Sequence, residues 1–505
     1  MGYNLAQGFA ESTERHPDRL ALQIGKSSYR YADLRGRVEA VSAWLRERTG
    51  GTPGARVAIF AKRSLDCYLG ILGTAWAGGT YVPLNPQLPE ERLARMLASS
   101  RVQAIVADRE HLPLLTARLR GRVPVLCPSE QPLASAAADG RPVDVGDAHV
   151  GYIEFTSGTT GFPKGVLVPS RAVAHFLGVS RVGLSVTTED RVAALSDITF
   201  DLSVFDMFFA WDRGAALYVV PAGQTMAPLG FIQEHGVSVC LAVPSVAAML
   251  RRMKLLRPGA MPSLRTSLFC GEPLPVALAH AWCEAAPWSV VENHYGPTEA
   301  TVACSRQRID ASGTPSLRGI VSIGEPFPGM RFVILDDDLR PLGPDSPGEL
   351  AISGPQLALG YDGDEEKTRQ KFVTLDGERW YLTGDLAQRD AQGRYFHLGR
   401  IDNQVKVRGM RVELEEIEAH LREVYATDAV AAVAWPVRDG SAEGIVAFIC
   451  GEMPQNAAEL RKALRSRLPG YMAPTALHFL AELPLNANAK IDRKQLLERL
   501  QSARA

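Results

Sequence analysis

The 505-residue sequence predicts an α/β fold, with a large N-terminal domain of layered sheets and helices and a small, mobile α+β C-terminal domain. Over the first 300 residues, short β-branched runs alternate with Ala/Leu-rich helical stretches, which is typical of sheets covered by helices. From about residue 320 the strand-like runs shorten and turns become frequent. This change predicts a β-rich subdomain at the end of the large domain.

The first elements can be assigned in chain order. Residues 55–61 (ARVAIFA) predict a strand, and the apolar segment 65–79 after it predicts a helix. Residues 102–108 (VQAIVAD) predict a second strand, followed by a Leu/Arg-rich helical segment. Further strands are expected at 192–196 and 216–221, because both runs are short and apolar.

The last hundred residues alternate again between helical and strand-like patterns. Helices are expected at 415–424 and 457–468, and a strand between them at 429–437. The polar stretch GRIDNQ (399–404) lies between two strand-like runs and predicts a hinge. We therefore expect two domains, residues 1–400 and 401–505.

Composition excludes several classes of protein. Hydrophobic residues make up 46% and charged residues 22%, as in ordinary globular proteins. A net charge of −1 gives no reason to expect a nucleic-acid or membrane surface. The seven scattered cysteines form no CxxC pair, and no apolar stretch approaches the length of a membrane span. Without an apolar signal region at the N-terminus, the sequence predicts a cytoplasmic protein.

The segment 155–165 (FTSGTTGFPKG) predicts a phosphate-binding loop. Six small residues precede Lys164, so the loop exposes backbone N–H groups and hydroxyls beside one cation, as a polyphosphate requires. The strand-like GYIEF run before it fixes the position of the loop. A Walker A loop is excluded because Lys164 is followed by Gly165 and not by Ser or Thr. ATP is therefore the expected ligand.

Eight motifs in order carry a resemblance to a known family. They are WAGGTYVPLNPQLPEER (76–92), FTSGTTGFPKG (155–165), FDLSVFDMF (200–208), NHYGPTEAT (293–301), GELAISGPQLALGY (348–361), YLTGD (381–385), GRIDNQVKVRGMRVELEEIE (399–418) and LPLNANAKIDR (483–493). Over nearly its whole length the chain resembles the adenylate-forming superfamily, and within it the amino-acid adenylation domains of nonribosomal peptide synthesis. The resemblance implies two steps: a carboxylate attacks the α-phosphate of ATP, and a phosphopantetheine thiol then takes the acyl group.

The resemblance also implies a nucleotide site. Hydroxyl and backbone groups of the loop, with Lys164, are expected to hold the β- and γ-phosphates, Thr298 the α-phosphate and Glu299 a Mg²⁺ ion. The expected nucleotide-binding residues are Thr156, Ser157, Gly158, Thr159, Thr160, Gly271, Asn293, Tyr295, Asp385 and Arg400. Among them, Tyr295 is expected to face adenine and Asp385 to accept the ribose hydroxyls.

Four residues of the C-terminal region are implicated by the same resemblance. Lys490 matches the family lysine that bridges the substrate carboxylate and the phosphate during adenylation. Asp402 matches the hinge position about which the C-terminal domain turns. Lys406 and Gly409 fall on the face that the family presents during thioester formation.

The family's substrate pocket can be carried over residue by residue. Its positions fall on Asp201, Leu202, Phe205, Leu241, Leu268, Cys270, His294, Val302, Ala303 and Lys490. Asp201 supplies a carboxylate for a substrate ammonium, so an amino acid is expected. The bulk of Phe205, Leu241 and Leu268 favours a small side chain such as that of alanine, glycine or serine. His294 is either a satisfied wall residue or a polar contact.

Several alternatives stay open at this point. Proline, a β-amino acid or D-alanine also fits parts of the pocket pattern, and stereochemistry is undetermined. An AMP-forming acyl-CoA ligase is a second enzyme class, although Asp201 has no role with an acyl chain. A nucleotide sensor without catalysis is disfavoured because Lys164, Glu299, Asp385 and Lys490 are all present. No carrier module follows Lys490, so a free-standing enzyme with a separate carrier protein is expected.

Overall fold

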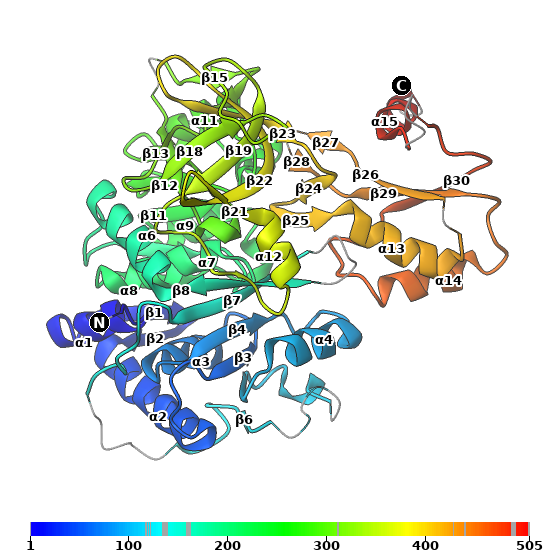
Figure 1. Ribbon diagram of the computed structural model, residues 1–505. Coiled ribbons are helices and arrows are strands. Elements are labelled where there is room, and N and C mark those ends of the chain that lie inside the picture. Colours follow the sequence, from blue (N-terminus) through cyan, green and yellow to red (C-terminus); the bar gives the residue numbers. More distant parts are fainter. Residues whose placement is uncertain are drawn as a thin grey trace.

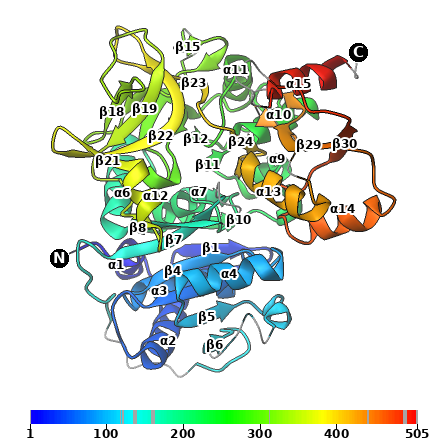
Figure 2. The same cartoon turned by 45° about the vertical axis from the view of Figure 1, so that its right-hand side comes forward.

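In the computed structural model, the described residues are 2–116, 119, 121, 123–133, 140–157, 163–310, 313–427, 429–438, 441–485 and 491–502. They form a large body of stacked sheets and helices, and the chain from about residue 404 projects to one side of it (Figures 1 and 2). The predicted α/β fold class is confirmed. None of the helices in these ranges is long and apolar enough to cross a membrane.

Two large sheets form the layers of the N-terminal part. The first has nine strands, in the order β17 (Glu325–Pro326), β14 (Ser305–Arg308), β13 (Val290–Tyr295), β12 (Thr266–Phe269), β11 (Val239–Ala242), β9 (Arg191–Ala194), β10 (Ala216–Val219), β1 (Leu20–Ile24) and β2 (Ser27–Arg30). The second has seven, in the order β20 (Gly360–Tyr361), β8 (Lys164–Pro169), β7 (Val150–Thr156), β4 (Thr80–Leu84), β3 (Arg56–Phe60), β5 (Ala104–Ala107) and β6 (Val125–Leu126). Parallel pairing in the middle of each sheet requires crossover connections, which the helices supply.

Helices cover and separate these sheets. They are α1 (Gln7–Arg15), α2 (Tyr31–Thr49), α3 (Leu65–Trp76), α4 (Glu90–Ser100), α6 (Ser170–Gly183), α9 (Leu229–His235), α10 (Pro244–Arg252) and α11 (Val276–Ala285). In α3 every residue from Asp66 to Trp76 is buried, as expected of a helix that is apolar on all sides. The Ser64 hydroxyl accepts a hydrogen bond from the Cys67 amide and so caps its first turn.

One irregular helical segment connects β9 to β10. It runs through α7 (Leu202–Val204), the π-helical turn η2 (Phe205–Phe209) and α8 (Ala210–Asp212), and all but the last of these residues are buried. A π-helical turn widens the helix by one residue and often marks a functional site. Here the helical segment begins directly after Asp201, and its widened turn starts at Phe205.

The predicted β-rich subdomain is also present. Its five strands are β18 (Arg331–Leu335), β19 (Gly348–Ser353), β22 (Glu378–Arg389), β21 (Phe372–Leu375) and β23 (Tyr395–Arg400). Smaller elements nearby are β15 (Ser316–Leu317), β16 (Ile320–Val321), α12 (Glu365–Lys371) and the short 3₁₀ helices η3 (Ala222–Gln224) and η4 (Thr298–Ala300). Beyond β5, the described part of the expected Leu/Arg-rich helix contains the short 3₁₀ helix η1 (Leu112–Leu114).

The C-terminal region builds its own cores. Its strands are β24 (Gln404–Val407), β25 (Met410–Glu413), β26 (Val430–Ala434), β27 (Val437–Arg438), β28 (Ser441–Ala442), β29 (Ile445–Cys450) and β30 (Ala476–Leu480), and its helices α13 (Leu414–Tyr425), α14 (Ala457–Arg465) and α15 (Arg493–Ser502). Two apolar clusters, within residues 405–479 and 431–500, contain no residue from before 401 among those described. A boundary at residues 400/401, which we propose, is compatible with this packing.

Candidate active site

Five of the expected nucleotide-binding residues line one cavity of about 240 Å³. They are Gly271, Asn293, Tyr295, Asp385 and Arg400. Gly271 follows β12, Asn293 and Tyr295 lie at the end of β13, and Asp385 lies within β22. The ends of parallel strands such as β12 and β13 are the usual place for a ligand. Gly271 has φ +91°, a conformation that disfavours side chains, so its backbone forms the wall directly.

Asn293 presents an unsatisfied group to this cavity. Its side-chain nitrogen donates a hydrogen bond of 2.9 Å to the Ser322 carbonyl, which fixes the orientation of the amide. Its side-chain oxygen is buried and has no partner. A buried acceptor without a donor is costly, and the edge of an adenine base could supply the missing N–H group.

Asp385 is held by three neighbours at the cavity wall. Its carboxylate accepts hydrogen bonds from Arg400 Nη1 at 2.7 Å and from Tyr295 Oη at 2.5 Å, and His397 Nε2 lies 3.3 Å away. Burial alone raises the pKa of Asp385, but the Arg400 charge and the contacts with His397 and Tyr295 hold it well below its ordinary value. Asp385 is therefore an anion with a fixed orientation.

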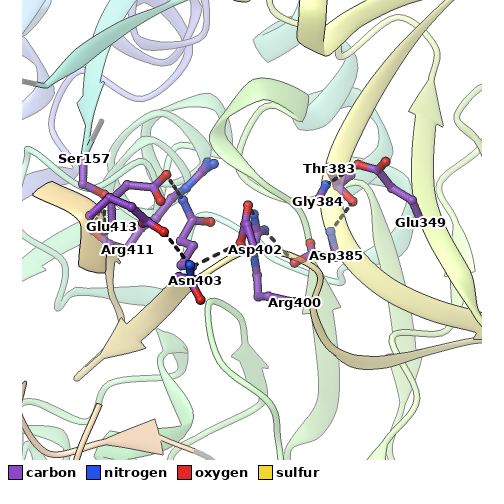
Figure 3. Close-up of polar contacts among 12 residues, drawn as sticks. Ser157, Glu349, Thr383, Gly384, Asp385, Arg400, Asp402, Asn403, Arg411 and Glu413 are labelled. Atoms are coloured by element: carbon purple, nitrogen blue, oxygen red, sulfur yellow. Dashed lines mark hydrogen bonds and ion pairs between the residues drawn. The ribbon is translucent and has the colours of Figure 1, made fainter. Parts of the chain in front are cut away.

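Arg400 bridges this carboxylate and the predicted hinge. Its Nε and Nη2 atoms donate to the two oxygens of Asp402, at 2.7 and 2.5 Å, so the pair is bidentate (Figure 3). On the other side of Asp385, the Gly384 amide donates to Glu349 Oε1 at 2.7 Å. Figure 3 shows Arg400 between the two aspartates, and Asp385 next to Gly384, which is hydrogen-bonded to Glu349.

Asp201 lies at the start of the widened helix, with only 4% of its surface exposed. Thr298 and the Val302 backbone act to lower its pKa, while its Oδ2 atom is buried without a partner among the described residues. Burial raises the pKa of Asp201 to about 6, although the Lys406 charge counteracts this shift. The buried Oδ2 atom is therefore an acceptor without a donor among the described residues, and a bound cation would supply one.

The other expected pocket residues are apolar walls around Asp201. Leu202, Phe205, Leu241, Leu268, Cys270, Val302 and Ala303 are 1–2% exposed and belong to one apolar cluster. Phe205 stacks on Phe209 with ring centres 4.8 Å apart, so it cannot move away easily. Burial raises the pKa of the Cys270 thiol to about 12, which keeps it protonated at neutral pH.

The Nε2 atom of the His294 ring has a partner within the protein. Its Nε2 atom lies 2.8 Å from Glu292 Oε2, and both side chains are buried. Its ring also packs edge-on against Phe327, with centres 5.6 Å apart. Of the two interpretations left open by the sequence, this geometry favours a wall residue.

The phosphate side of the site begins at the end of β7. Thr156 stands opposite Lys164 in the β7–β8 pair, so the two ends of the loop lie side by side. Burial lowers the pKa of Lys164. Gly158, Thr159 and Thr160 lie outside the described residues, and so does Lys490.

Glu299 has both carboxylate oxygens engaged. It is fully buried, and its Oε1 accepts a hydrogen bond from Tyr361 Oη at 2.8 Å. Its Oε2 accepts one from Arg411 Nη1, also at 2.8 Å. Burial tends to raise the pKa of Glu299, but Arg411 and Tyr361 together lower it. The expected metal ligand is thus an anion paired with a residue of the C-terminal region.

Arg411 belongs to the hairpin β24–β25, which reaches the site from the C-terminal region. The Ser157 hydroxyl donates to the Arg411 carbonyl at 3.0 Å and accepts from the Glu413 amide at 3.2 Å (Figure 3). At the tip, Gly409 has φ +82°, and a Cβ atom there would lie 2.8 Å from Val243 Cγ1. Only glycine therefore fits without displacement of its neighbour.

Hairpin residues line the nucleotide cavity, and Arg408, between β24 and β25, also lines a second, larger cavity of about 490 Å³. We name this second space the arginine cavity, because its lining includes Arg251, Arg252, Arg408 and Arg438. Glu443 is the only carboxylate among the described residues that line it. Ala442 lines both cavities, so the two spaces adjoin.

Several contacts at the site were not predicted individually. Arg411 and Tyr361 hold Glu299, and His397 approaches Asp385. Arg411 and Tyr361 lie within two of the eight motifs, which therefore contained their signal, and His397 lies just before the motif that contains Arg411. Their partners, however, are 112, 62 and 12 positions away in the chain.

Comparison with known proteins yields a consistent set of matches. Residues 9–362 match the family described as AMP-binding enzyme, and residues 416–490 match the AMP-binding enzyme C-terminal domain. Tyrocidine synthase 2 of Brevibacillus parabrevis is 34% identical over 500 residues. This match covers 97% of the chain but 13% of that synthase, so the chain spans a small part of the relative's length.

Solved structures match over nearly the whole chain. One is the Vibrio cholerae adenylation domain AlmE in complex with glycyl-adenosine-5'-phosphate, with a TM-score of 0.90 and 29% identity. The match covers 99% of this chain and 98% of that one. Another is IdnL7, with a TM-score of 0.73, 33% identity and full coverage of both chains.

Proposed function

The chain belongs to the family of AMP-binding enzymes, and we propose that it activates a small amino acid as its adenylate and transfers it to a carrier protein. In the first step, a carboxylate oxygen of the amino acid bonds to the α-phosphorus of ATP. The bond from that phosphorus to the β-phosphate oxygen breaks, and pyrophosphate leaves. The thiol of a phosphopantetheine arm then displaces AMP and forms a thioester.

One observation supports an amino acid, and not a fatty or aryl acid, as the substrate. Asp201 is buried, and its Oδ2 atom has no partner among the described residues. A substrate ammonium supplies the missing positive charge, whereas a fatty or aryl acid leaves the carboxylate unpaired at a cost of several kcal/mol. The tightly packed walls at Phe205, Leu241 and Leu268 favour alanine, glycine or serine. The glycyl adenylate bound in AlmE supports this size class.

The nucleotide is expected to bind with adenine against Tyr295 and Asn293 and with its ribose hydroxyls on Asp385. The phosphates then extend toward Ser157 and Lys164, which is a cation even after partial burial. These residues contribute mainly by positioning and by charge stabilisation. Thr298 lines the cavity beside Thr156 and Ser157 and is proposed to orient the reacting phosphate.

Magnesium fits this site as an ion shared with the nucleotide. No group of three or more Asp, Glu, His or Cys side chains able to hold a metal exists among the described residues. Glu299 offers one hard carboxylate oxygen, Oε2, on the phosphate side, and phosphate oxygens suit the remaining positions of the ion. When bound, the ion neutralises charge that develops on the leaving pyrophosphate.

The C-terminal residues are proposed to serve the two steps in turn. Lys490 is proposed to bridge the carboxylate and the phosphate during adenylation, and rotation about Asp402 then brings the hairpin with Lys406 and Gly409 to the site. Lys406 lines the nucleotide cavity. Its charge also lowers the pKa of Asp201.

The arginine cavity supports a carrier protein as the partner. A phosphopantetheine arm carries a phosphate near its attachment point and a thiol at its far end. Arg252 and Arg438 lie 3.3 and 3.6 Å from the same Glu443 oxygen, so one carboxylate serves two guanidinium groups. The excess positive charge suits a phosphate, and the adjoining nucleotide cavity suits the thiol end.

ATP–pyrophosphate exchange tests the first step. We expect exchange with alanine, glycine or serine, and weaker exchange with proline, β-amino acids and D-alanine. Fatty and aryl acids are the controls that represent acyl-CoA ligase activity. Exchange with those acids alone would refute the amino-acid assignment.

Thioester formation tests the second step and its partner. Pantetheine and 4'-phosphopantetheine present the same thiol but differ in the phosphate. We expect R252Q and R438Q to slow transfer to 4'-phosphopantetheine about tenfold relative to pantetheine, because each removes a charge-assisted hydrogen bond. R422Q, on the outer face of α13, is the matched control. Equal losses with both thiols would show that the cavity does not bind the phosphate.

A further inference from the structure

Glu299 is a buried carboxylate that two different cations are expected to use. In this structure its Oε2 atom is 2.8 Å from Arg411 Nη1, while Tyr361 occupies its other oxygen. The proposed function assigns the same carboxylate to magnesium. Because Glu299 is fully buried, it cannot be left without a cation at small cost.

The hairpin that carries Arg411 also occupies the start of the phosphate loop. Ser157 makes hydrogen bonds to the backbone on both sides of Val412, at 3.0 Å to the Arg411 carbonyl and 3.2 Å from the Glu413 amide. The remaining cavity beside Thr156, Ser157 and Thr298 has a volume of about 80 Å³. The docked hairpin therefore fills the region that Mg²⁺ and pyrophosphate require.

We propose that Arg411 takes the place of the magnesium ion on Glu299 when metal and pyrophosphate leave, so that the metal-bound and hairpin-docked states exclude each other. This inference rests on the proposed function only in assigning the metal to Glu299. Arg411 is a positioning residue: it contacts no substrate and acts through Glu299. Its charge keeps the buried carboxylate paired while the hairpin is docked.

Competition between the metal ion and Arg411 for Glu299 constrains the order in which ligands bind and leave. A ligand that binds only one of two states shifts the population toward that state. Mg²⁺ with pyrophosphate should therefore expel the hairpin, and a docked hairpin should weaken metal binding. ATP cannot enter with its metal until the hairpin has left, which protects the adenylate from premature exchange.

Manganese binding provides a test that does not depend on turnover. Mn²⁺ prefers the same hard oxygen ligands and is detected by electron paramagnetic resonance. With pyrophosphate present and no amino acid, R411Q should bind Mn²⁺ about tenfold more tightly than the unaltered protein, because the competing cation is gone. R411K retains one positive charge and should lie closer to the unaltered protein.

Two control variants make the outcome decisive. R422Q removes an arginine from the exposed side of α13 in the same domain and should leave Mn²⁺ affinity unchanged. E299Q should abolish the tight Mn²⁺ site, and thermal unfolding of each variant checks that it is folded. Equal Mn²⁺ affinity in R411Q and the unaltered protein, or tight binding in E299Q, would overturn the inference. A negative exchange screen with every amino acid would instead refute the proposed function and leave this binding result intact.

Discussion

Two buried aspartates, Asp385 and Asp201, have pKa values that are shifted in opposite directions. Asp385, at the nucleoside end, contacts Arg400, Tyr295 and His397, and its pKa lies well below the ordinary value. In Asp201, proposed for the amino-acid end, the Oδ2 atom is buried without a partner among the described residues, and burial raises the pKa to about 6.

The two carboxylates differ in how many of their interaction partners the protein itself provides. The nucleoside end is preorganised, because its carboxylate is neutralised and oriented before a ligand arrives. We propose that the amino-acid end instead leaves Asp201 Oδ2 for a cation that the substrate brings. Selectivity for an ammonium would follow, since a buried unpaired carboxylate penalises every substrate without an amine.

Removing the Asp201 carboxylate should have the largest effect. D201N leaves the substrate ammonium without a counter-ion in a buried site, so kcat/KM for amino-acid-dependent exchange should fall on the order of 10²–10³-fold. Asp206, in the same helical segment, provides a matched control. Burial raises its pKa to about 8, so it is mostly uncharged at neutral pH, and D206N should change exchange less than threefold. Similar losses in both variants would mean that helix packing, and not charge, is responsible.

Removing the Asp385 carboxylate should have a smaller effect, and it should weaken the binding of ATP instead of the amino acid. D385N should weaken ATP binding about 10- to 100-fold, because it removes a charged acceptor for two hydroxyls. Calorimetric titration with ATP measures this loss directly. D390N breaks a similar Asp–Arg pair with Arg394, outside the site, and is the control. If D385N binds ATP normally, the nucleoside is not held at Asp385.

The opposite pKa shifts predict opposite effects of pH on stability. Because the folded pKa of Asp201 exceeds its unfolded value, the protein loses stability as pH rises from about 4 to about 6. D201N lacks this cost and should be more stable than the unaltered protein at pH 7, by about 3 kcal/mol, with no advantage near pH 4. For Asp385 the sign reverses: its contribution is present above pH 4 and lost on acidification. Denaturant unfolding of the ligand-free variants at both pH values measures these differences.

The smallest effect should come from Lys406, whose charge lowers the pKa of Asp201. K406Q should move the acidic limb of the kcat/KM profile for the amino acid to higher pH, by about 0.3 unit for an exposed charge. The pH profile of exchange between pH 5 and 8 measures the shift. A shift to lower pH, or none, would show that Lys406 does not act on Asp201 in solution.

Much of this site could be anticipated from local sequence patterns. Small residues before Lys164 predicted a phosphate loop, and alternating strand and helix patterns predicted the layers whose edge carries the nucleotide cavity. The strand before the loop was confirmed as β7, and the expected tail helices as α13 and α14. The segment beyond β5 was harder, because its Leu/Arg-rich pattern is compatible with a helix while its described part is only a 3₁₀ turn.

The sequence by itself determined which chemical groups the protein has. It also predicted the strands and helices that carry them, because strand and helix patterns depend on neighbouring residues. Tertiary structure alone decided their partners: Arg411 on Glu299, Tyr295 on Asp385 and Ser157 on the hairpin backbone, 112, 90 and 254 positions apart. Such pairs arise when separate layers and the C-terminal region pack together, and no local pattern encodes that packing. Among the described residues, the same packing leaves Asp201 Oδ2 without a partner and supplies Glu299 with Arg411.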